Sequence, residues 1–340
     1  MQAIKLTKPY DVRLVELDKP TPGHGEALIR IVTAGICGSD IGAYRGTNAL
    51  VQYPVILGHE LAGIIETLPE DYSGDLKPGD GVVLNPYLHC GQCYPCSLGR
   101  TNCCENLRVR GVHIDGGMAE YVTHPADMIV AVPPGMTREE AAMAEPLTIS
   151  LHGIHRGELK AGEHCVIIGA GPIGLLAALA AKAYDAVPIV IDILPERLEF
   201  ARSIGIDEVI NPNLEDAVQR IEKITNGRMA ELVMECSGAN GAIRSTLDYV
   251  AFAGRITLTG WPKDETSLPT DIITKKELDI RGARTSVGEF EEALELIHSK
   301  RVDVMAIHTM TIGIKEAPAV IRDIMANPQD YLKVIVEIPT

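Results

Sequence analysis

The spacing of apolar and polar residues divides the chain into two parts. Over the first 145 residues, short runs of β-forming residues alternate with turns rich in glycine and proline, which predicts strands at 27–31, 61–67, 81–84 and 119–123. From about residue 163 the pattern changes to an apolar strand followed by a helix, repeated along the chain. We therefore expect an α/β protein in which a β-rich domain accompanies a doubly wound parallel sheet.

The elements of the second part can be predicted individually. Strands are expected at 165–168, 188–192, 208–210, 232–235 and 255–258, and helices at 173–183, 195–204, 216–225 and 242–249. Later helices are predicted near 289–300 and at 317–326, followed by a last strand at 332–338. A length of 340 residues corresponds to about two domains.

Composition and charge narrow the class of protein. Hydrophobic residues make up 46% of the chain and charged residues 23%, as in an ordinary folded protein. The 31 basic and 46 acidic residues leave a net charge of −15, which disfavours nucleic acids and anionic membranes as partners. From the first residues we expect no targeting leader, and the longest uncharged apolar run, 165–181, contains glycines and is too short to span a membrane. We expect a cytoplasmic protein that acts on a small molecule.

Half of the eight cysteines lie in one cluster, Cys90-x2-Cys93-x2-Cys96-x7-Cys104, in a loop rich in turn residues. Disulfides are improbable in a cytoplasmic chain, and four thiols at this spacing can surround one ion. All four tetrahedral positions would then be filled by the protein, which predicts a structural zinc site. An iron–sulfur cluster and a chance grouping of free thiols are the alternatives, and Cys103 is an alternative fourth ligand.

A glycine-rich turn, Gly169-Ala-Gly171-Pro-Ile-Gly174, follows the apolar strand at 165–168 and opens a helix. In this position backbone N–H groups and the helix N-terminus can hold a pyrophosphate. Asp192, eighteen residues after Gly174, ends the next strand and can accept hydrogen bonds from the adenosine ribose, which favours NAD over NADP. A tight turn without a ligand is the alternative. The predicted cofactor residues are Gly169, Gly171, Pro172, Ile173, Gly174, Asp192 and Arg197.

A third set of residues is scattered along the chain: Cys37 in GICGSD, His59 and Glu60 in GHE, and Glu145 in EPL. Taken singly, these residues could be a core thiol, a buried histidine and surface acids, and their spacing alone does not bring them together. In this order, however, and with the four-cysteine loop and GAGPIG, they resemble the medium-chain, zinc-dependent alcohol and polyol dehydrogenases. The resemblance extends over essentially the whole chain.

The resemblance implies a domain organisation. A GroES-like catalytic domain would comprise residues 1–147, with the structural zinc lobe at about 86–108, and would be completed by residues 285–340. An NAD-binding Rossmann domain would occupy residues 148–284. Relatives of this kind are dimers or tetramers, so the resemblance also implies a homo-oligomer.

The resemblance also implies a catalytic site. Cys37 and His59 would bind a catalytic zinc ion, with Glu60 and Glu145 as alternating carboxylate ligands and Asp40 orienting His59. The metal would lower the pKa of a substrate hydroxyl, Ser39 would accept its proton, and the carbon would give hydride to NAD. Many relatives carry a histidine three residues after this serine, where this chain has Gly42. The relay beyond Ser39 would then use Tyr44, cofactor hydroxyls or water.

Three segments of the chain resemble a smaller group within this family and so predict a class of substrate. The segments 44–46, 111–117 and 282–284 resemble the sugar-acid dehydrogenases that oxidise C5 of L-galactonate or L-gulonate, although threonine dehydrogenases share the motif GVHxDG. We expect Arg284, with Arg45 or Arg110, to pair with a substrate carboxylate unless these are surface charges. The predicted substrate residues are Tyr44, Arg45, His113, Asp115 and Arg284. Alternatives are an L-threonine 3-dehydrogenase, a sorbitol dehydrogenase, a nucleotide-binding protein without catalysis and a redox thiol protein.

Overall fold

The computed structural model describes residues 1–339 and divides into two compact units. Unit 1 contains residues Met1–Glu145, Phe290–His298 and the described residues from Ile307 onwards, and unit 2 contains Pro146–Glu289 and Ser299–Ala306. The segment expected to bind NAD, 148–284, lies within unit 2. Of the segment expected to return to the first domain, residues 285–289 and 299–306 stay with unit 2.

Unit 1 is built mainly from antiparallel sheets. A three-stranded sheet has the order β2-β1-β4, with β1 at Gln2–Lys8, β2 at Asp11–Glu16 and β4 at Val55–Ile56. A seven-stranded sheet has the order β10-β6-β5-β3-β18-β17, and β9 also pairs with β3. Its strands are β3 (Glu26–Ile36), β5 (Glu60–Thr67), β6 (Gly81–Leu84), β9 (Tyr121–Pro125), β10 (Ile129–Ala131), β17 (His308–Gly313) and β18 (Lys333–Glu337).

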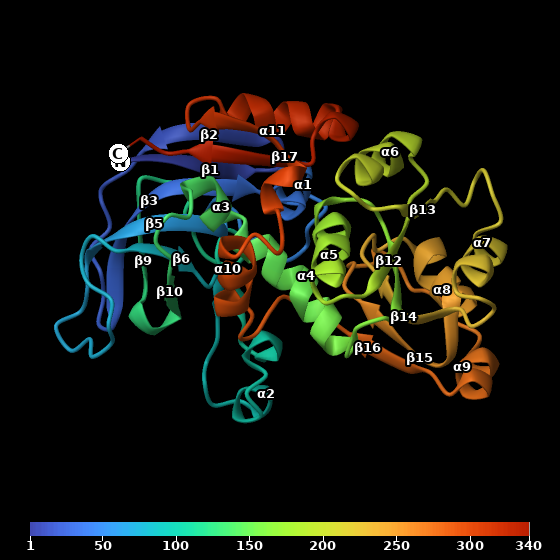
Figure 1. The fold of residues 1–340 in the computed structure, drawn as a ribbon. Helices are drawn as coiled ribbons and strands as arrows, with labels where there is room; N and C mark the ends of the chain where they lie inside the picture. The colour runs from blue at the N-terminus through green and yellow to red at the C-terminus, as the bar shows by residue number, and fades with distance from the viewer. Residues whose placement is uncertain (340) are drawn as a thin grey trace. The chain divides into compact units, whose positions relative to one another are not determined.

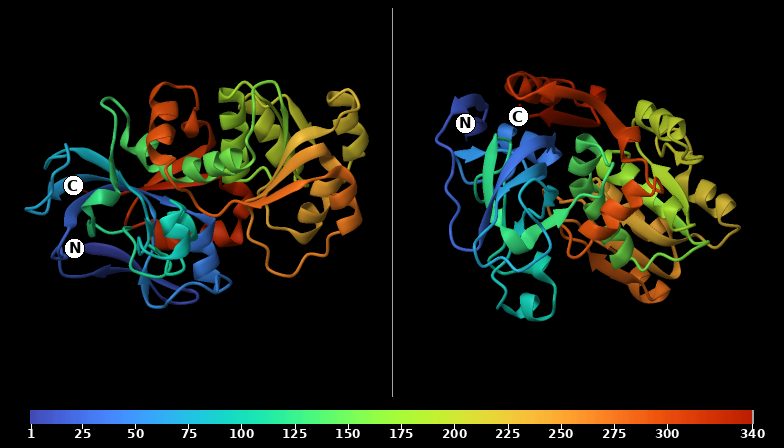
Figure 2. Two further views of the ribbon diagram at one scale, coloured as in Figure 1. Left: turned by 90° about the horizontal axis from the view of Figure 1, so that it is seen from below. Right: turned by 60° about the vertical axis from the view of Figure 1, so that its left-hand side comes forward.

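The two ends of the chain meet in the seven-stranded sheet. β3 is buried along nearly its whole length, and β18 pairs with it antiparallel, placing Val334 opposite Ile36. In Figures 1 and 2 the red C-terminal segment accordingly lies among the blue N-terminal strands. The apolar faces of these strands form one core that includes Ile29, Leu61 and Val336. The seven-stranded sheet of unit 1 is therefore complete only when β18, the last strand of the chain, has paired with β3.

Short helices and a small hairpin complete unit 1. The hairpin joins β7 (Tyr87–Leu88) to β8 (Arg108–Val109). The helices are α1 (Gly38–Arg45), α2 (Tyr94–Ser97), α3 (Arg138–Ala142), α10 (Phe290–His298), α11 (Ala317–Ala326) and the 3-10 turns η1 (Thr101–Cys103), η2 (Ala126–Met128) and η4 (Pro328–Asp330). α4 (Ala144–Arg156) and η3 (Val304–Ile307) contain a boundary between the units.

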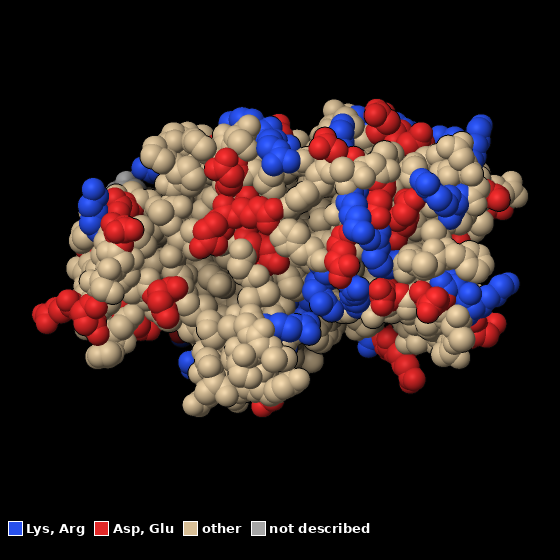
Figure 3. Space-filling model, turned by 60° about the horizontal axis from the view of Figure 1, so that its bottom comes forward, with Lys and Arg blue, Asp and Glu red and all other residues tan. Residues whose placement is uncertain are grey.

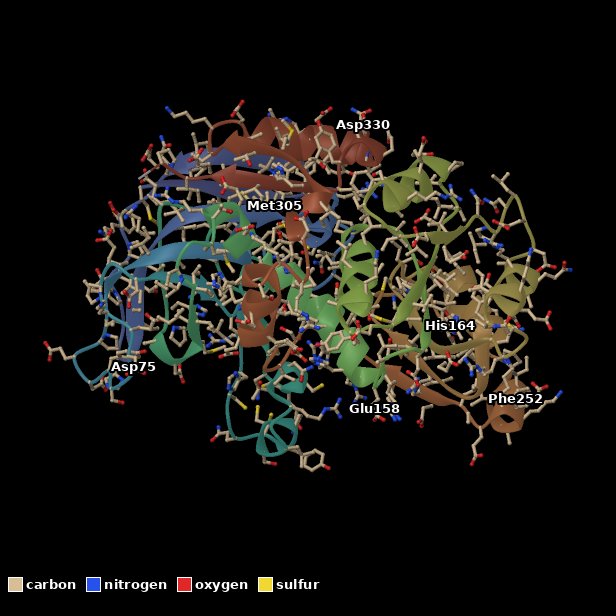
Figure 4. All side chains as sticks on the ribbon, viewed as in Figure 1. Asp75, Glu158, His164, Phe252, Met305 and Asp330 are labelled. Atoms are coloured by element: carbon tan, nitrogen blue, oxygen red, sulfur yellow. The ribbon has the colours of Figure 1, made fainter. Side chains whose placement is uncertain are left out.

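Unit 2 is a six-stranded parallel sheet with helices between its strands (Figure 1). Its order is β13-β12-β11-β14-β15-β16, and Figure 4 labels His164 at the start of β11. The elements are β11 (His164–Ile168), α5 (Pro172–Ala183), β12 (Val187–Ile191), α6 (Pro195–Ser203), β13 (Glu208–Ile210), α7 (Ala217–Ile224), β14 (Ala230–Glu235), α8 (Asn240–Tyr249), β15 (Val250–Leu258), α9 (Thr270–Lys276) and β16 (Asp279–Gly282). Numbered along the chain, these strands have the order 3-2-1-4-5-6, which is that of a doubly wound nucleotide-binding sheet.

The fold class expected from the sequence is confirmed, with differences in detail. β15 starts at Val250 rather than at 255, and α4 forms where no helix was expected. No helix within residues 1–339 is both long and apolar enough to cross a bilayer. On the face drawn in Figure 3, basic side chains are interrupted by acidic ones, as expected for a chain with an acidic excess.

Candidate functional site

Three residues from one region of unit 1 form a compact cluster of metal-ligating groups. Cys37 lies between β3 and α1, His59 precedes β5, and Glu60 is the first residue of β5. One ligand atom of each lies within 4.8 Å of the others, and His59 and Glu60 are buried. Gly35 lies opposite Glu60 in the sheet, where a Cβ would come within 1.8 Å of a Glu60 oxygen. A thiol, an imidazole and a carboxylate at this separation suit zinc.

The surroundings of His59 also fit a metal. Asp40 Oδ1 lies 4.0 Å from His59 Nδ1, and both atoms are buried without a hydrogen-bond partner in the described chain. A small movement would let Nδ1–H donate to Asp40, which would leave Nε2 for the ion. Ser39 Oγ lies 3.5 Å from that Nε2. Burial alone would lower the pKa of His59, but Cys37, Asp40 and Glu145 raise it well above its usual range.

Glu145 lies close to this cluster at the start of α4. The hydroxyl of Tyr87 donates to Glu145 Oε1, and both side chains are buried. Burial raises the pKa of Glu145 to about 7 and that of Tyr87 well above its usual range. Glu60 also raises the Glu145 pKa, whereas His59 lowers it. The two carboxylates therefore interact electrostatically, although Glu145 is not among the three residues whose ligand atoms lie within 4.8 Å of one another.

The two carboxylates differ in their partners, because Glu60 is bound to a lysine. Lys333 Nζ donates to both oxygens of Glu60 at 2.5 and 2.7 Å, and both side chains are buried. Burial acts to lower the pKa of Lys333, but Glu60 and Cys37 raise it above its usual value. The ammonium group thus restrains Glu60, whereas Glu145 is held by a neutral hydroxyl.

Replacing Lys333 with methionine should leave Glu60 as a buried charge without its cation. We expect the free energy of unfolding to fall by about 3–5 kcal/mol, measured by urea unfolding of the metal-free protein. The double variant K333M/E60Q should recover much of this loss, since no buried charge remains. Lys315→Met, at an exposed lysine of the same unit, is the matched control. A loss below about 1 kcal/mol in K333M would show that water solvates Glu60.

The four clustered cysteines meet in the loop around α2, where Figure 4 shows yellow sulfur atoms gathered. Cys93 Sγ lies 3.4 Å from Cys96 Sγ and 3.8 Å from Cys104 Sγ. Tetrahedral sulfur ligands about 2.3 Å from zinc lie about 3.8 Å apart. Backbone N–H groups of Gln92 and Cys93 lower the pKa of Cys90 to about 6, which favours its thiolate, whereas burial and Cys93 raise the pKa of Cys96 to about 12.

The remaining cysteines have other surroundings. Cys104 and not Cys103 belongs to the cluster, and Cys103 Sγ instead lies 3.8 Å from Arg100. Burial raises the pKa of both Cys165 and Cys236. Cys165 is buried in β11, and Cys236 is half-buried just after β14.

The glycine-rich turn of unit 2 has the geometry of a phosphate cradle. Gly169 has a positive φ of 107°, and a Cβ at Gly174 would lie 1.8 Å from Gly169 O, so both positions require glycine. Apart from Gly171 and its chain neighbours, no atom of residues 1–339 lies within 4 Å of where a Cβ of Gly171 would be. α5 begins next, at Pro172, and no side chain caps it. The turn thus leaves open space and a helix N-terminus for an anionic group.

Asp192 closes the other side of this turn. Its two carboxylate oxygens accept the N–H groups of Ala170 at 2.7 Å and Leu194 at 2.9 Å. Arg197 is half-buried nearby, and Asp192 acts to raise its pKa while burial lowers it below its usual value. The structure thus brings Asp192, Arg197 and the glycine turn together in unit 2, as a dinucleotide site requires.

The predicted substrate residues are not gathered in one place. Tyr44 is buried in the core of unit 1, where its ring packs edge-on against Tyr10, so its side chain has a structural role. Arg45 is exposed at the end of α1, and Arg284 is half-buried in unit 2 after β16. Asp115 accepts the N–H of Ile56 at 2.8 Å. The predicted substrate residues therefore lie in different surroundings, some in the core, some at the surface and some in loops.

Arg110 and His113 lie in the same part of unit 1. Arg110 is buried and donates to His124 Nδ1 at 2.7 Å, to the Asp115 carbonyl at 3.1 Å and to the Thr123 carbonyl. It therefore has a structural role. His113 accepts the N–H of Val109 through Nδ1 and lines a cavity described below.

Sequence reasoning missed two residues beside the metal cluster, Tyr87 and Lys333. Lys333 carried a signal, because a charged residue that opens an otherwise apolar strand needs a buried partner. Tyr87 carried none, since its contact with Glu145 depends on the folding of α4.

Two family models match the chain, one in its N-terminal part and one from α5 to the end of α10. The model described as an alcohol dehydrogenase GroES-like domain matches residues 23–134, and the zinc-binding dehydrogenase model matches residues 172–299.

Individual relatives match most of the chain. An uncharacterized zinc-type alcohol dehydrogenase-like protein of Haemophilus influenzae is 54% identical over 334 residues, covering 98% of both chains. L-galactonate-5-dehydrogenase of Escherichia coli is 35% identical over 91% of each chain. L-threonine 3-dehydrogenase of Thermococcus kodakarensis is 38% identical over 83% of this chain and 82% of its own. Among solved structures, an alcohol dehydrogenase of E. coli complexed with NADH superposes with a TM-score of 0.91, at 30% identity and over 99% of both chains.

Proposed function

Because the chain belongs to the zinc-binding alcohol dehydrogenase family and is an oxidoreductase acting on CH–OH groups, we propose that it oxidises a secondary hydroxyl of a sugar acid with NAD. The best candidates are L-galactonate and L-gulonate, oxidised at C5. The observation that supports the reaction is the cluster of half-buried Cys37 with buried His59 and Glu60, near buried Glu145. Ketone reduction would follow the same path in reverse.

The residues of the chain have distinct tasks in this reaction. Cys37, His59 and one of the two carboxylates would hold zinc, and the glycine turn with Asp192 would hold NAD. When bound, zinc supplies Lewis-acid polarisation of the substrate hydroxyl and NAD supplies the hydride acceptor. Ser39, whose Oγ lies 3.5 Å from His59 Nε2, would accept the hydroxyl proton. Tyr87 and Lys333 hold Glu145 and Glu60 in different ways, so the two carboxylates need not serve equally as ligands.

The relay beyond Ser39 needs a group other than the absent histidine. Gly42 stands at its position, and the Tyr44 ring is held in the core. We therefore assign the next proton transfer to water or to cofactor hydroxyls.

A substrate scan tests this proposal. Enzyme with two zinc ions per chain should reduce NAD with L-galactonate or L-gulonate at a kcat/KM at least about tenfold above that with sorbitol or L-threonine, a difference of about 1.4 kcal/mol. A preference for L-threonine would instead support the second candidate, which the 38% identity to a threonine dehydrogenase favours. Zinc-loaded protein without turnover on any of these alcohols would indicate a nucleotide-binding protein that has lost catalysis.

Cofactor preference depends on Asp192. Replacing it with serine removes a carboxylate that would bind the ribose and repel a 2′-phosphate, so kcat/KM for NAD should fall about 10–100-fold while that for NADP rises. Initial rates with each cofactor at fixed substrate provide the measurement. Asp207→Ser, at an exposed acid of the same unit, is the control. Unchanged NAD kinetics in Asp192→Ser would remove this residue from the cofactor site.

A further inference from the structure

We propose that a cavity beside the four-cysteine loop binds the carboxylate of the substrate, with Arg108 as its cationic group. The inference rests on the proposed function and names the part of the molecule that would select an acid over a neutral polyol. The cavity has a volume of about 600 Å³, within the range of small-molecule sites. Its walls include Gln52, Leu88, His89, Arg108, His113 and Ile114.

The charge of this cavity differs from that of the chain. A guanidinium, two imidazoles and two amides line it, and no aspartate or glutamate does so in the described chain, although acidic residues exceed basic ones by 46 to 31. Leu88, Leu107 and Ile114 provide apolar wall. Nitrogen donors on an apolar background suit an anionic, polyhydroxylated ligand.

Two arginines close in sequence have separate tasks. Arg110 is buried, and its bonds to His124 and to backbone carbonyls fix it in place. Arg108 is exposed, and within residues 1–339 its guanidinium makes no hydrogen bond or ion pair. A guanidinium at a cavity wall without a protein partner can form two parallel hydrogen bonds to a carboxylate.

The walls of the cavity are attached to the segments that carry the metal cluster. In the β7–β8 hairpin, Leu88 pairs with Arg108, and Tyr87, the residue before Leu88, donates to Glu145. The loop at 111–117 packs backbone to backbone against Gly58, since a Cβ on Gly116 would lie 2.4 Å from the Gly58 carbonyl. His59, a residue of the metal cluster, is the next residue after Gly58. In a sugar acid oxidised at C5, four carbon–carbon bonds separate the reacting carbon from the carboxylate carbon. The residues that bind the carboxylate must therefore lie apart from the metal ligands but be held at a fixed distance from them.

A competing role for Arg108 is to balance the negative charge of the thiolate cluster, because Cys90 also lines the cavity. Loss of Arg108 would then release zinc, whatever the substrate. The zinc content of the variants separates the two roles.

Kinetics on a matched pair of substrates test the proposal. L-galactonate and galactitol differ only in the carboxylate, which is a hydroxymethyl group in galactitol. For Arg108→Gln we expect kcat/KM for L-galactonate to fall about 10–100-fold, mainly through KM, and that for galactitol to change less than about threefold. Arg108→Lys should restore part of the loss. The control is Arg322→Gln, at an exposed arginine of the same unit.

Three results would overturn the assignment: equal losses on both substrates, an unchanged rate on L-galactonate, or loss of a zinc ion. Calorimetric titration with L-galactonate tests the cavity without turnover and should show weaker binding to Arg108→Gln. Wild-type enzyme that neither binds nor oxidises any aldonate would overturn the proposed function together with this inference. Wild-type enzyme that oxidises aldonates and is indifferent to Arg108 would overturn this inference alone.

Discussion

Cys37→Ser should reduce turnover by at least about a thousandfold and remove one of two zinc ions per chain. A thiolate is the strongest zinc ligand in the cluster of Cys37, His59 and Glu60, and a serine hydroxyl cannot replace it at neutral pH. The loss corresponds to about 4 kcal/mol of Lewis-acid stabilisation of the alkoxide. Initial rates of NAD reduction and metal analysis on the same sample provide the measurement.

The matched control is Cys103→Ser, which removes a thiol that belongs to neither metal cluster. It should retain two zinc ions and its full rate. The melting temperature of Cys37→Ser should also stay close to that of the wild type, because Cys37 is not part of the apolar core. Wild-type turnover in Cys37→Ser, or loss of both zinc ions, would contradict the assignment of a separate catalytic site.

Cys104→Ser should cost the second zinc ion and the order of its loop. Structural zinc sites bind with apparent free energies of about 10–16 kcal/mol in small zinc-binding domains, and a loop that closes around an ion loses its organisation without it. The melting temperature should fall by about 5 °C or more. Limited proteolysis should then cut between residues 89 and 108.

Cys103→Ser again provides the control, because it replaces a sulfur atom with oxygen at the residue next to Cys104. It should melt like the wild type and resist proteolysis in the loop. If Cys103→Ser and Cys104→Ser lost zinc equally, the geometry that excludes Cys103 from the cluster would be wrong.

Much of the fold and part of the site follow from local sequence. The strand order of unit 2 arises from alternating strands and helices, and GAGPIG with Asp192 can be recognised because its parts are neighbours in sequence. The four-cysteine cluster is equally local. For these features, the residues that act together are also close along the chain.

Other features depend on contacts between distant segments. Lys333 and Glu60 are 273 positions apart, and Tyr87 and Glu145 are 58 positions apart, so neither pair could be assigned from its surroundings in sequence. The prediction of Tyr44 as a substrate residue rested on a motif, whereas the structure shows that the same segment packs its aromatic ring into the core. Arg110 shows the same effect, since burial gives an arginine a structural role that its sequence does not reveal.

The position of β18 between β3 and β17 has a consequence for biosynthesis. A nascent chain that has released unit 2 from the ribosome still lacks β17 and β18, the two strands at one edge of the seven-stranded sheet of unit 1, and the ammonium group that accompanies Glu60. The catalytic ligands are therefore translated long before the residue that restrains one of them. Metal loading of that site in its final form should follow chain termination, whereas the four-cysteine loop can close around its ion during elongation.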